Sequence, residues 1–372
     1  MRPLSLRTKL VCTLAVIVSI AACPLIYFGY VDTLERTVSA AKDKFEKNNQ
    51  ILEEQLSLSY LDGQTPMAGL ALGVASVAWC ADTVLGAGGW LQATGAAAAA
   101  ALLLLLAVRS IFHFDTVMAD WRHPVAGSII PTFAMGLMVI SKTVGIVSPA
   151  AGMGLWLGAV VLHLTVLAGF LFFRLRGAVM REMVPSWFVP PVGIIVADVT
   201  FPGAVWLEPV AEGCLWLGLV SYAVMLPLML YRLFFGTTVA EGARPTLAIM
   251  AAPASLSLAG YLTVVPTPDY LLCAVLLGIA LLMTFVIYFA FWHLLRLRFT
   301  PGYAAFTFPM AIGATALFKA ADAVAKLPGT EGYVLTLERL GFVELTVAAV
   351  IIGYVFLLYM KHLPEFLADA DR

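Results

Sequence analysis

Few residues of this sequence could do chemistry, and those that could lie inside long apolar stretches. The stretch 302–322 is the clearest case, since Phe306 and Phe308 come just before an internal proline, Pro309, and Lys319 follows. Proline in a helix interior removes a hydrogen bond and frees a backbone carbonyl. Because lipid offers that carbonyl no partner, a broken apolar helix is expected to line a cavity or to be covered by protein. The rest of the chain repeats this design of an apolar stretch broken by proline.

Ionisable residues inside apolar stretches are the next candidates, because they are costly in a membrane and often functional. Lys142, Asp198 and Lys319 fall toward the same end of their stretches. They would form a vestibule whose lysines attract anions, or they would form salt bridges between neighbouring helices. A coupled carrier commonly has a carboxylate near mid-membrane, and Asp198 is the one fair candidate. This favours passive permeation of an anion.

Enzyme chemistry has no support in the sequence. It holds no nucleotide-binding motif, no metal-ligand spacing and no nucleophile–base constellation, so we expect no enzyme activity, no metal and no cofactor. The five cysteines are scattered and are interpreted as small apolar fillers. A net charge of −1 indicates no bulk basic patch for nucleic acid.

Membrane helices must position these candidates. Of 372 residues, 61% are hydrophobic and 12% are charged, whereas an average soluble domain has about 25% charged residues. From Pro66 onward there are ten apolar segments, most of them long enough to cross about 30 Å of hydrocarbon. Their approximate bounds are 66–84, 89–109, 124–144, 149–173, 188–203, 211–235, 245–265, 269–295, 302–325 and 338–361.

Prolines reveal an internal repeat. They recur in the odd segments at intervals of 56 to 63 residues, while most even segments are smooth and leucine-rich, with Pro227 as an exception. A fixed period indicates a repeated unit, here a hairpin of one broken and one regular helix used five times. Five broken helices would close around a central pore, and five smooth helices would face lipid. The predicted pore kinks are Pro131, Pro190, Pro253 and Pro309, and the predicted pore-lining small residues are Gly69, Gly73, Gly136, Gly193, Gly260 and Gly313. Chance placement of the prolines and simple helix packing by the glycines are the alternatives.

Three regions follow: 1–60, a hydrophobic helix and a charged amphipathic or coiled-coil helix; 61–362, the ten-helix domain; and 363–372, a short cytoplasmic tail. Basic residues gather in the loops after even segments, which places those loops and both ends of the ten-helix domain in the cytoplasm. If residues 10–30 cross the membrane, Arg2, Arg7 and Lys9 must lie outside, against the same rule. The alternatives are a first helix that does not cross, or a cleaved signal sequence.

Four stretches carry a resemblance to a known family. They are Gly69-Leu-Ala-Leu-Gly73; Arg122-His-Pro-Val125 with Pro131-Thr-Phe-Ala-Met135; Trp187-Phe-Val-Pro-Pro-Val-Gly193; and Phe306-Thr-Phe-Pro-Met310 with Ala316-Leu-Phe-Lys319. Together, in this order and with the hairpin period, they resemble the tellurite-resistance/dicarboxylate transporter family, which includes bacterial TehA, fungal malate permeases and plant slow anion channels. The resemblance covers about residues 60–362, and residues 1–60 depart from the bacterial members.

The resemblance implies five hairpins around a pore, a homotrimer, and a ninth-helix phenylalanine that plugs the pore. By motif that residue is Phe308, while Phe306 lies on a different helix face. We therefore expect an inner-membrane anion channel or channel-like exporter, passing small anions or C4-dicarboxylates through a pore gated by Phe308. The alternatives are a coupled secondary carrier for malate-like dicarboxylates or tellurium oxyanions, and a membrane sensor that signals through residues 10–58.

Overall fold

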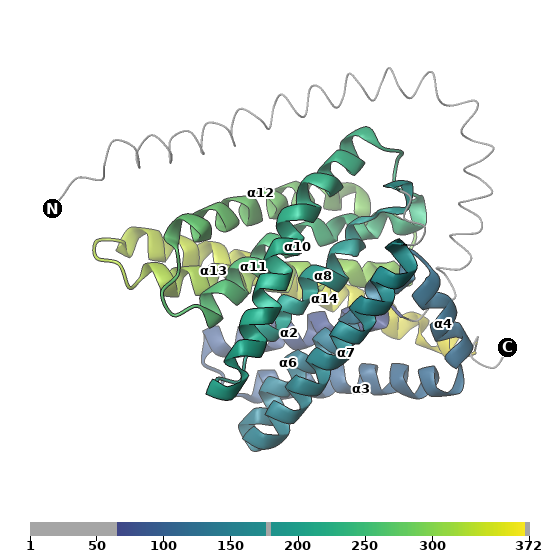
Figure 1. Cartoon of the computed structure of the whole chain (residues 1–372), viewed down its shortest axis with the longest axis horizontal. Coiled ribbons are helices and arrows are strands. Elements are labelled where there is room, and N and C mark those ends of the chain that lie inside the picture. Colours follow the sequence, from purple (N-terminus) through teal and green to yellow (C-terminus); the bar gives the residue numbers. More distant parts are fainter. Residues whose placement is uncertain (1–64, 176–179, 369–372) are drawn as a thin grey trace. The chain divides into compact units, whose positions relative to one another are not determined.

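The computed structural model describes residues 65–175 and 180–368 (Figure 1). The N-terminal helices expected at 10–30 and 31–58 lie outside the described residues, as do 369–372 of the expected tail. Throughout the described part the regular elements are α-helices and 3-10 helices, with no strand. The prediction of an all-α membrane protein is confirmed.

The even segments form uninterrupted helices, because smooth leucine-rich runs keep every backbone hydrogen bond inside the helix. They are α3 (Trp90–Phe112), α7 (Pro149–Leu175), α10 (Glu208–Phe235), α12 (Tyr270–Leu294) and α14 (Glu331–Ala368). The last helix begins seven residues before the expected start at 338, because the charged turn that holds Glu338 and Arg339 is itself helical. Pro227 is accommodated inside α10.

The odd segments are broken, with the exception of the first. The first is α2 (Met67–Leu85), which follows Pro66 without interruption. The others are α5 (Ala126–Ile129) with α6 (Pro131–Val147); η2 (Pro185–Phe188), α8 (Val189–Val192), η3 (Gly193–Ile195) and α9 (Val196–Val199); η5 (Glu241–Ala251) with α11 (Ala252–Val264); and η6 (Pro301–Phe306) with α13 (Phe308–Val324). Short connecting elements are α4 (Phe114–Arg122), η1 (Met180–Glu182) and η4 (Val205–Leu207).

Prolines stand where the broken helices restart. Pro131, Pro190, Pro253 and Pro309 each occupy the first or second position of an α-helix. This position suits proline, since its fixed φ fits the first turn and its missing N–H would have no partner there. The third, seventh and ninth segments therefore enter as a short helix or 3-10 turn and continue as a regular α-helix from the proline onward. The fifth segment instead continues as the short pieces α8, η3 and α9.

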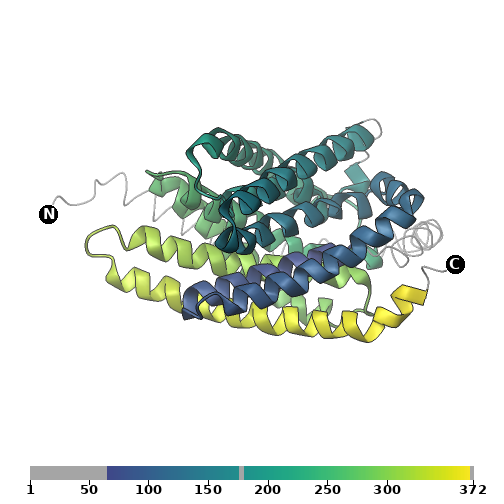
Figure 2. The ribbon, with the colours of Figure 1, turned by 90° about the horizontal axis from the view of Figure 1, so that it is seen from below.

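Burial separates an inner from an outer set of helices. In the described part, nine spans have the length and hydropathy to cross a membrane, and Pro185–Val199 is a shorter apolar helix. Leaving aside this short fifth segment, the four odd spans have 56% to 78% of the residues in their most apolar windows buried. The corresponding fraction in the five even spans is 22% to 39%. Figure 2 shows one hairpin of the repeat, α13 beside α14, as adjacent yellow-green and yellow helices. The odd helices are thus inside and the even helices outside, as the repeat predicts.

Candidate functional site

The five odd segments together enclose an apolar cavity of about 60 Å³. Every one of them contributes to its wall. The lining residues are Pro66, Gly69, Leu72, Ile129, Thr132, Met135, Phe188, Val189, Val192, Gly193, Ile249, Ala252, Pro253, Leu256, Gly302, Ala304, Ala305, Phe308 and Pro309. Thr132 has the only polar side chain in this wall, and its hydroxyl is already donated to the Ile129 carbonyl at 2.7 Å. The cavity therefore presents almost no hydrogen-bonding side chain to a solute.

Phe308 is the first residue of α13, at the restart of the ninth helix, and its side chain borders the cavity with 8% of its surface exposed. Phe306 is absent from the lining residues and is fully buried on the other side of the chain. Its ring centroid lies 5.5 Å from that of Phe291 and 4.8 Å from that of Tyr303. The two phenylalanines thus face different surroundings, as expected from their spacing.

Helix α2 packs closely against the break that precedes Phe308. The Thr307 hydroxyl shares its one proton between two acceptors, the Gly69 carbonyl at 3.0 Å and the Ala304 carbonyl at 2.7 Å. A methyl group at Gly73 would lie 2.5 Å from Thr307 Cβ and 3.2 Å from the Phe308 amide nitrogen. The Gly69-x-x-x-Gly73 pair therefore lets the backbone of α2 approach the base of Phe308.

The predicted glycines divide into two groups. Gly69 and Gly193 line the cavity, and Pro253 and Pro309 do so among the predicted kinks. The other four predicted glycines do not line the cavity and instead contact neighbouring helices. Pro131 and Pro190 are also absent from the cavity wall. An added methyl would face Thr307 at Gly73, Leu103 at Gly136, Ile195 and Asp198 at Gly260, and Glu344 at Gly313. Close helix approach accounts for this second group.

Phe188 is a cavity residue that sequence reasoning missed. It borders the cavity from the fifth helix, and its ring lies edge-on to Tyr222 with centroids 6.0 Å apart. The signal was present in the repeat, because Phe188 stands two residues before Pro190 and Phe308 stands one before Pro309. Two aromatic rings thus reach the same cavity from different helices.

A carbonyl of the broken fifth helix has a hydrogen-bond partner on an outer helix. His163 of α7 is fully buried, and its Nε2 lies 2.8 Å from the Pro190 carbonyl oxygen. A carbonyl can only accept, so Nε2 carries the proton in this tautomer. This bond ties the outer helix α7 to the inner fifth segment.

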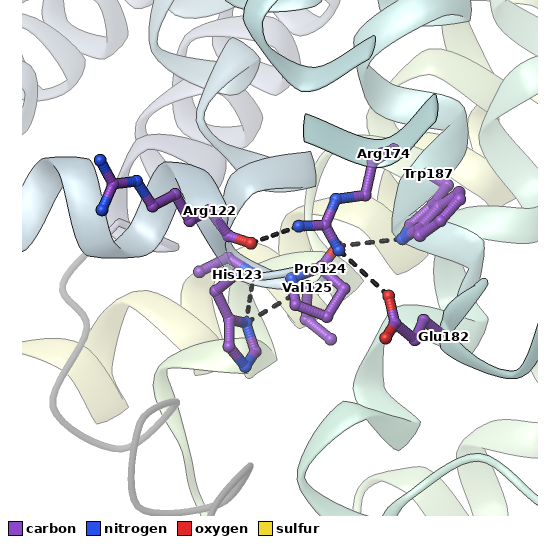
Figure 3. A network of polar contacts seen from close by, with 8 residues as sticks. Arg122, His123, Pro124, Val125, Arg174, Glu182 and Trp187 are labelled. Atoms are coloured by element: carbon purple, nitrogen blue, oxygen red, sulfur yellow. Dashed lines mark hydrogen bonds and ion pairs between the residues drawn. The ribbon is translucent and has the colours of Figure 1, made fainter. Parts of the chain in front are cut away.

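A polar network joins two of the family-like stretches at the arginine-rich end of the helices (Figure 3). Trp187 donates its indole N–H to the Pro124 carbonyl at 2.9 Å. Arg174 pairs with Glu182 at 3.1 Å and donates to the Arg122 carbonyl. The stretch beginning at Arg122 and the stretch beginning at Trp187 are thereby held together, which fixes where the third and fifth helices enter the bundle.

His123 and Asp120 complete this end of the molecule. His123 Nδ1 accepts hydrogen bonds from the backbone amides of Val125 and Ala126 at 3.3 and 3.2 Å, as Figure 3 shows. Burial, reinforced by the Arg174 charge, lowers the pKa of His123 below its ordinary value. Asp120 accepts a bond from the Thr65 hydroxyl at 2.5 Å. Burial raises the pKa of Asp120, and the Thr65 bond and the Arg109 charge oppose that rise.

The three candidate vestibule charges do not lie together. Lys142 of α6 and Lys319 of α13 are half-buried and within electrostatic range of each other. Asp198 is fully buried away from them, with its Cβ 3.2 Å from where a methyl on Gly260 would be and its charge within range of Cys214. In the described part of the chain neither Asp198 oxygen has a hydrogen-bond partner. Asp198 therefore belongs to the packing between α9, α10 and α11.

The cavity has the character of an apolar constriction. Within residues 65–175 and 180–368 no group of His, Cys, Asp and Glu could hold a metal ion. The cavity offers apolar surface and an aromatic side chain, and such constrictions close a pore by excluding water.

Comparison with known proteins assigns the chain to a family of anion channels. Residues 66–360 match the voltage-dependent anion channel family. Two curated relatives are Uncharacterized transporter MJ0576 and Uncharacterized transporter MJ0762 of Methanocaldococcus jannaschii. The first is 24% identical over 227 residues, covering 55% of this chain and 65% of the relative. The second is 23% identical over 220 residues, covering 53% of this chain and 64% of the relative. The match thus spans just under two thirds of each relative's length.

Proposed function

The chain belongs to the voltage-dependent anion channel family, and from that premise we propose that it is a passive pore for small anions, closed at rest by Phe308. It is a multi-pass membrane protein, and we place it in the inner membrane. The proposed substrates are small monovalent anions or C4-dicarboxylates, and the proposed assembly is a homotrimer. Tellurite resistance would follow if tellurium oxyanions are among the anions that pass.

One observation carries the gate assignment: Phe308 borders a cavity to which all five inner segments contribute. An apolar cavity at this position excludes water, and an ion cannot cross it without a hydrated path. Rotation or removal of one ring would change the width of that path directly. Weak binding along an apolar wall also allows an ion to leave quickly.

Planar-bilayer recording tests the proposal. Purified wild type should be nearly silent, whereas Phe308→Ala should pass anion currents whose reversal potentials rank the permeant anions. Phe306→Leu is the matched control, because Phe306 lies two residues before Phe308 in the same inner segment but outside the cavity, and it should leave the wild-type silence intact. Equal conductance in Phe308→Ala and wild type would show that Phe308 does not close the pore.

A coupled carrier is the second candidate, favoured by the buried, unpartnered carboxyl of Asp198. Intramembrane carboxylates are common in proton-coupled transport. Liposome uptake of malate under an imposed pH gradient separates the two functions. Uptake driven by the anion gradient alone supports the pore, while uptake that follows the pH gradient and is lost in Asp198→Asn supports the carrier.

A further inference from the structure

The ends of the inner helices beyond the cavity hold two half-buried lysines. Lys142 lies seven residues past Met135 and Lys319 eleven past Phe308, or about 10 and 16 Å along a helix that rises about 1.5 Å per residue. Both lie on the side of the cavity away from the arginine-rich loops. Neither lysine forms an ion pair in the described part of the chain.

The surroundings of Lys142 are defined by contacts from two other inner segments. Its ammonium donates to the Phe201 carbonyl at 3.2 Å, just after α9, and lies 5.8 Å from the ring centroid of Trp79 on α2. Both partners are weak compensation for a full positive charge, since a carbonyl and an aromatic face supply only partial negative charge. The carbonyl and the ring orient the ammonium without neutralising it.

Lys319 approaches the same region from α13. The charged groups within its electrostatic range are Lys142 and Asp322, and the neutral thiol of Cys80 lies nearby. Asp322 is exposed to solvent one turn further along the same helix. Helices α6 and α13 both pack against α2, so the two lysines come from either side of it. Two ammonium groups held near each other in a half-buried setting repel, and an anion between them would relieve that repulsion.

Two other carboxylates, those of Asp82 and Asp198, are engaged elsewhere. Asp82 accepts hydrogen bonds from the backbone amides of Gly89 at 2.9 Å and Leu91 at 3.1 Å, which holds the turn between α2 and α3. Asp198 is buried toward α10 and α11. Neither is placed to cancel the lysine charges.

We propose that Lys142 and Lys319, with Trp79 and the Phe201 carbonyl as supports, form a binding site for a small anion at the mouth opposite the arginine-rich loops. The site deepens the proposed function, because it would concentrate anions before they reach the cavity. It is occupied whether or not Phe308 blocks the path, since it lies beyond that residue. Attraction of this kind raises the arrival rate of ions and weakens as salt is added.

Equilibrium binding tests the site without reference to conduction. Purified wild type is titrated with sodium nitrate and, separately, with sodium succinate, at ionic strength held constant with sodium gluconate, and tryptophan fluorescence is followed. Lys142→Gln and Lys319→Gln should each weaken binding of the preferred probe about five- to tenfold, as expected for loss of one partly buried charge contact. Glutamine can still donate to the Phe201 carbonyl, so Lys142→Gln preserves that support.

Lys326→Gln is the matched control, because Lys326 is an exposed lysine just past the end of α13. It removes the same charge from the same neighbourhood and should leave affinity within twofold of wild type. Unchanged affinity in both Lys142→Gln and Lys319→Gln, or an equal loss in Lys326→Gln, overturns the site.

Conduction then separates this site from the proposed function. In a Phe308→Ala background, Lys142→Gln and Lys319→Gln should reduce current carried by anions entering from the lysine side about threefold or more at low salt, and little at high salt. If binding depends on the lysines but no variant passes current, the anion-binding site is supported and the proposed pore is contradicted. If Phe308→Ala passes a current that neither lysine substitution changes, and binding is also unchanged by both, the pore is supported and the anion-binding site is contradicted.

Discussion

The Thr307 hydroxyl donates to the Gly69 carbonyl at 3.0 Å, joining residues 238 positions apart in the chain. The bond ties the first inner helix to the break of the ninth, one residue before Phe308. Phe308 is therefore held by a contact between helices as well as by its own helix.

Thr307→Val should weaken this contact between α2 and the break before Phe308, while keeping the shape of the side chain. Loss of one interhelical hydrogen bond is expected to cost about 0.5–1.5 kcal/mol, seen as a lower melting temperature in detergent and as anion leak through an otherwise silent protein. Thr263→Val is the control, since the Thr263 hydroxyl bonds within its own helix, to the Ala259 carbonyl at 2.6 Å. Leak of the same size in both variants would contradict the role of Thr307.

Gly73→Ala should disturb the same contact, because the added methyl group would crowd Thr307. Its methyl would meet Thr307 Cβ at 2.5 Å and the Phe308 amide at 3.2 Å, so α2 and the break must separate, at a cost of about 1–3 kcal/mol. Thermal unfolding measures the cost, and bilayer recording shows whether the silent state survives. Gly278→Ala in α12 meets no atom within 4 Å and should be neutral.

His123 should make stability fall in mild acid. Its folded-state pKa is lowered by burial and by Arg174, so the unfolded chain binds the proton more readily. The stability that neutral His123 provides is complete above its ordinary pKa of about 6.5 and is lost as pH falls from there through the lowered value. Protonation would also remove the lone pair that accepts from Val125 and Ala126.

The His123→Asn variant tests this dependence, because an asparagine oxygen can cap the same amides without titrating. Melting temperatures measured from pH 7.5 down to pH 5 should decline less in His123→Asn than in wild type. His113→Asn, at an exposed histidine, should follow the wild-type decline. Parallel curves for His123→Asn and wild type would exclude His123 as the source.

Asp198→Asn should be well tolerated, whereas Asp198→Leu should not. A buried carboxylate without a partner is expensive, and an amide of the same shape carries no charge, so Asn is expected to keep the melting temperature within a few degrees. Leucine adds branched bulk next to Gly260 and should lower it clearly. Anion currents in an Asp198→Asn, Phe308→Ala protein should match those of Phe308→Ala. Loss of current in the double variant would give Asp198 a direct role.

The class of the protein, the hairpin repeat and the places where helices restart could all be predicted from the amino-acid sequence. These follow from local properties, because the length of an apolar run sets whether a helix can span lipid, and proline acts on its own turn of backbone. Pro131, Pro190, Pro253 and Pro309 all stand at helix starts for this reason. The family resemblance over residues 60–362 is confirmed by the match at 66–360.

The side chains that face the cavity could not be predicted from the sequence, because they depend on how the helices pack together. A helix can rotate about its axis without changing its sequence pattern, and in an apolar protein both faces are apolar, so the packing of neighbours sets the rotation. Gly69 therefore reaches the cavity, whereas Gly136 meets Leu103. For the same reason the contacts between helices brought Lys142 and Lys319 within range of each other and turned Asp198 away.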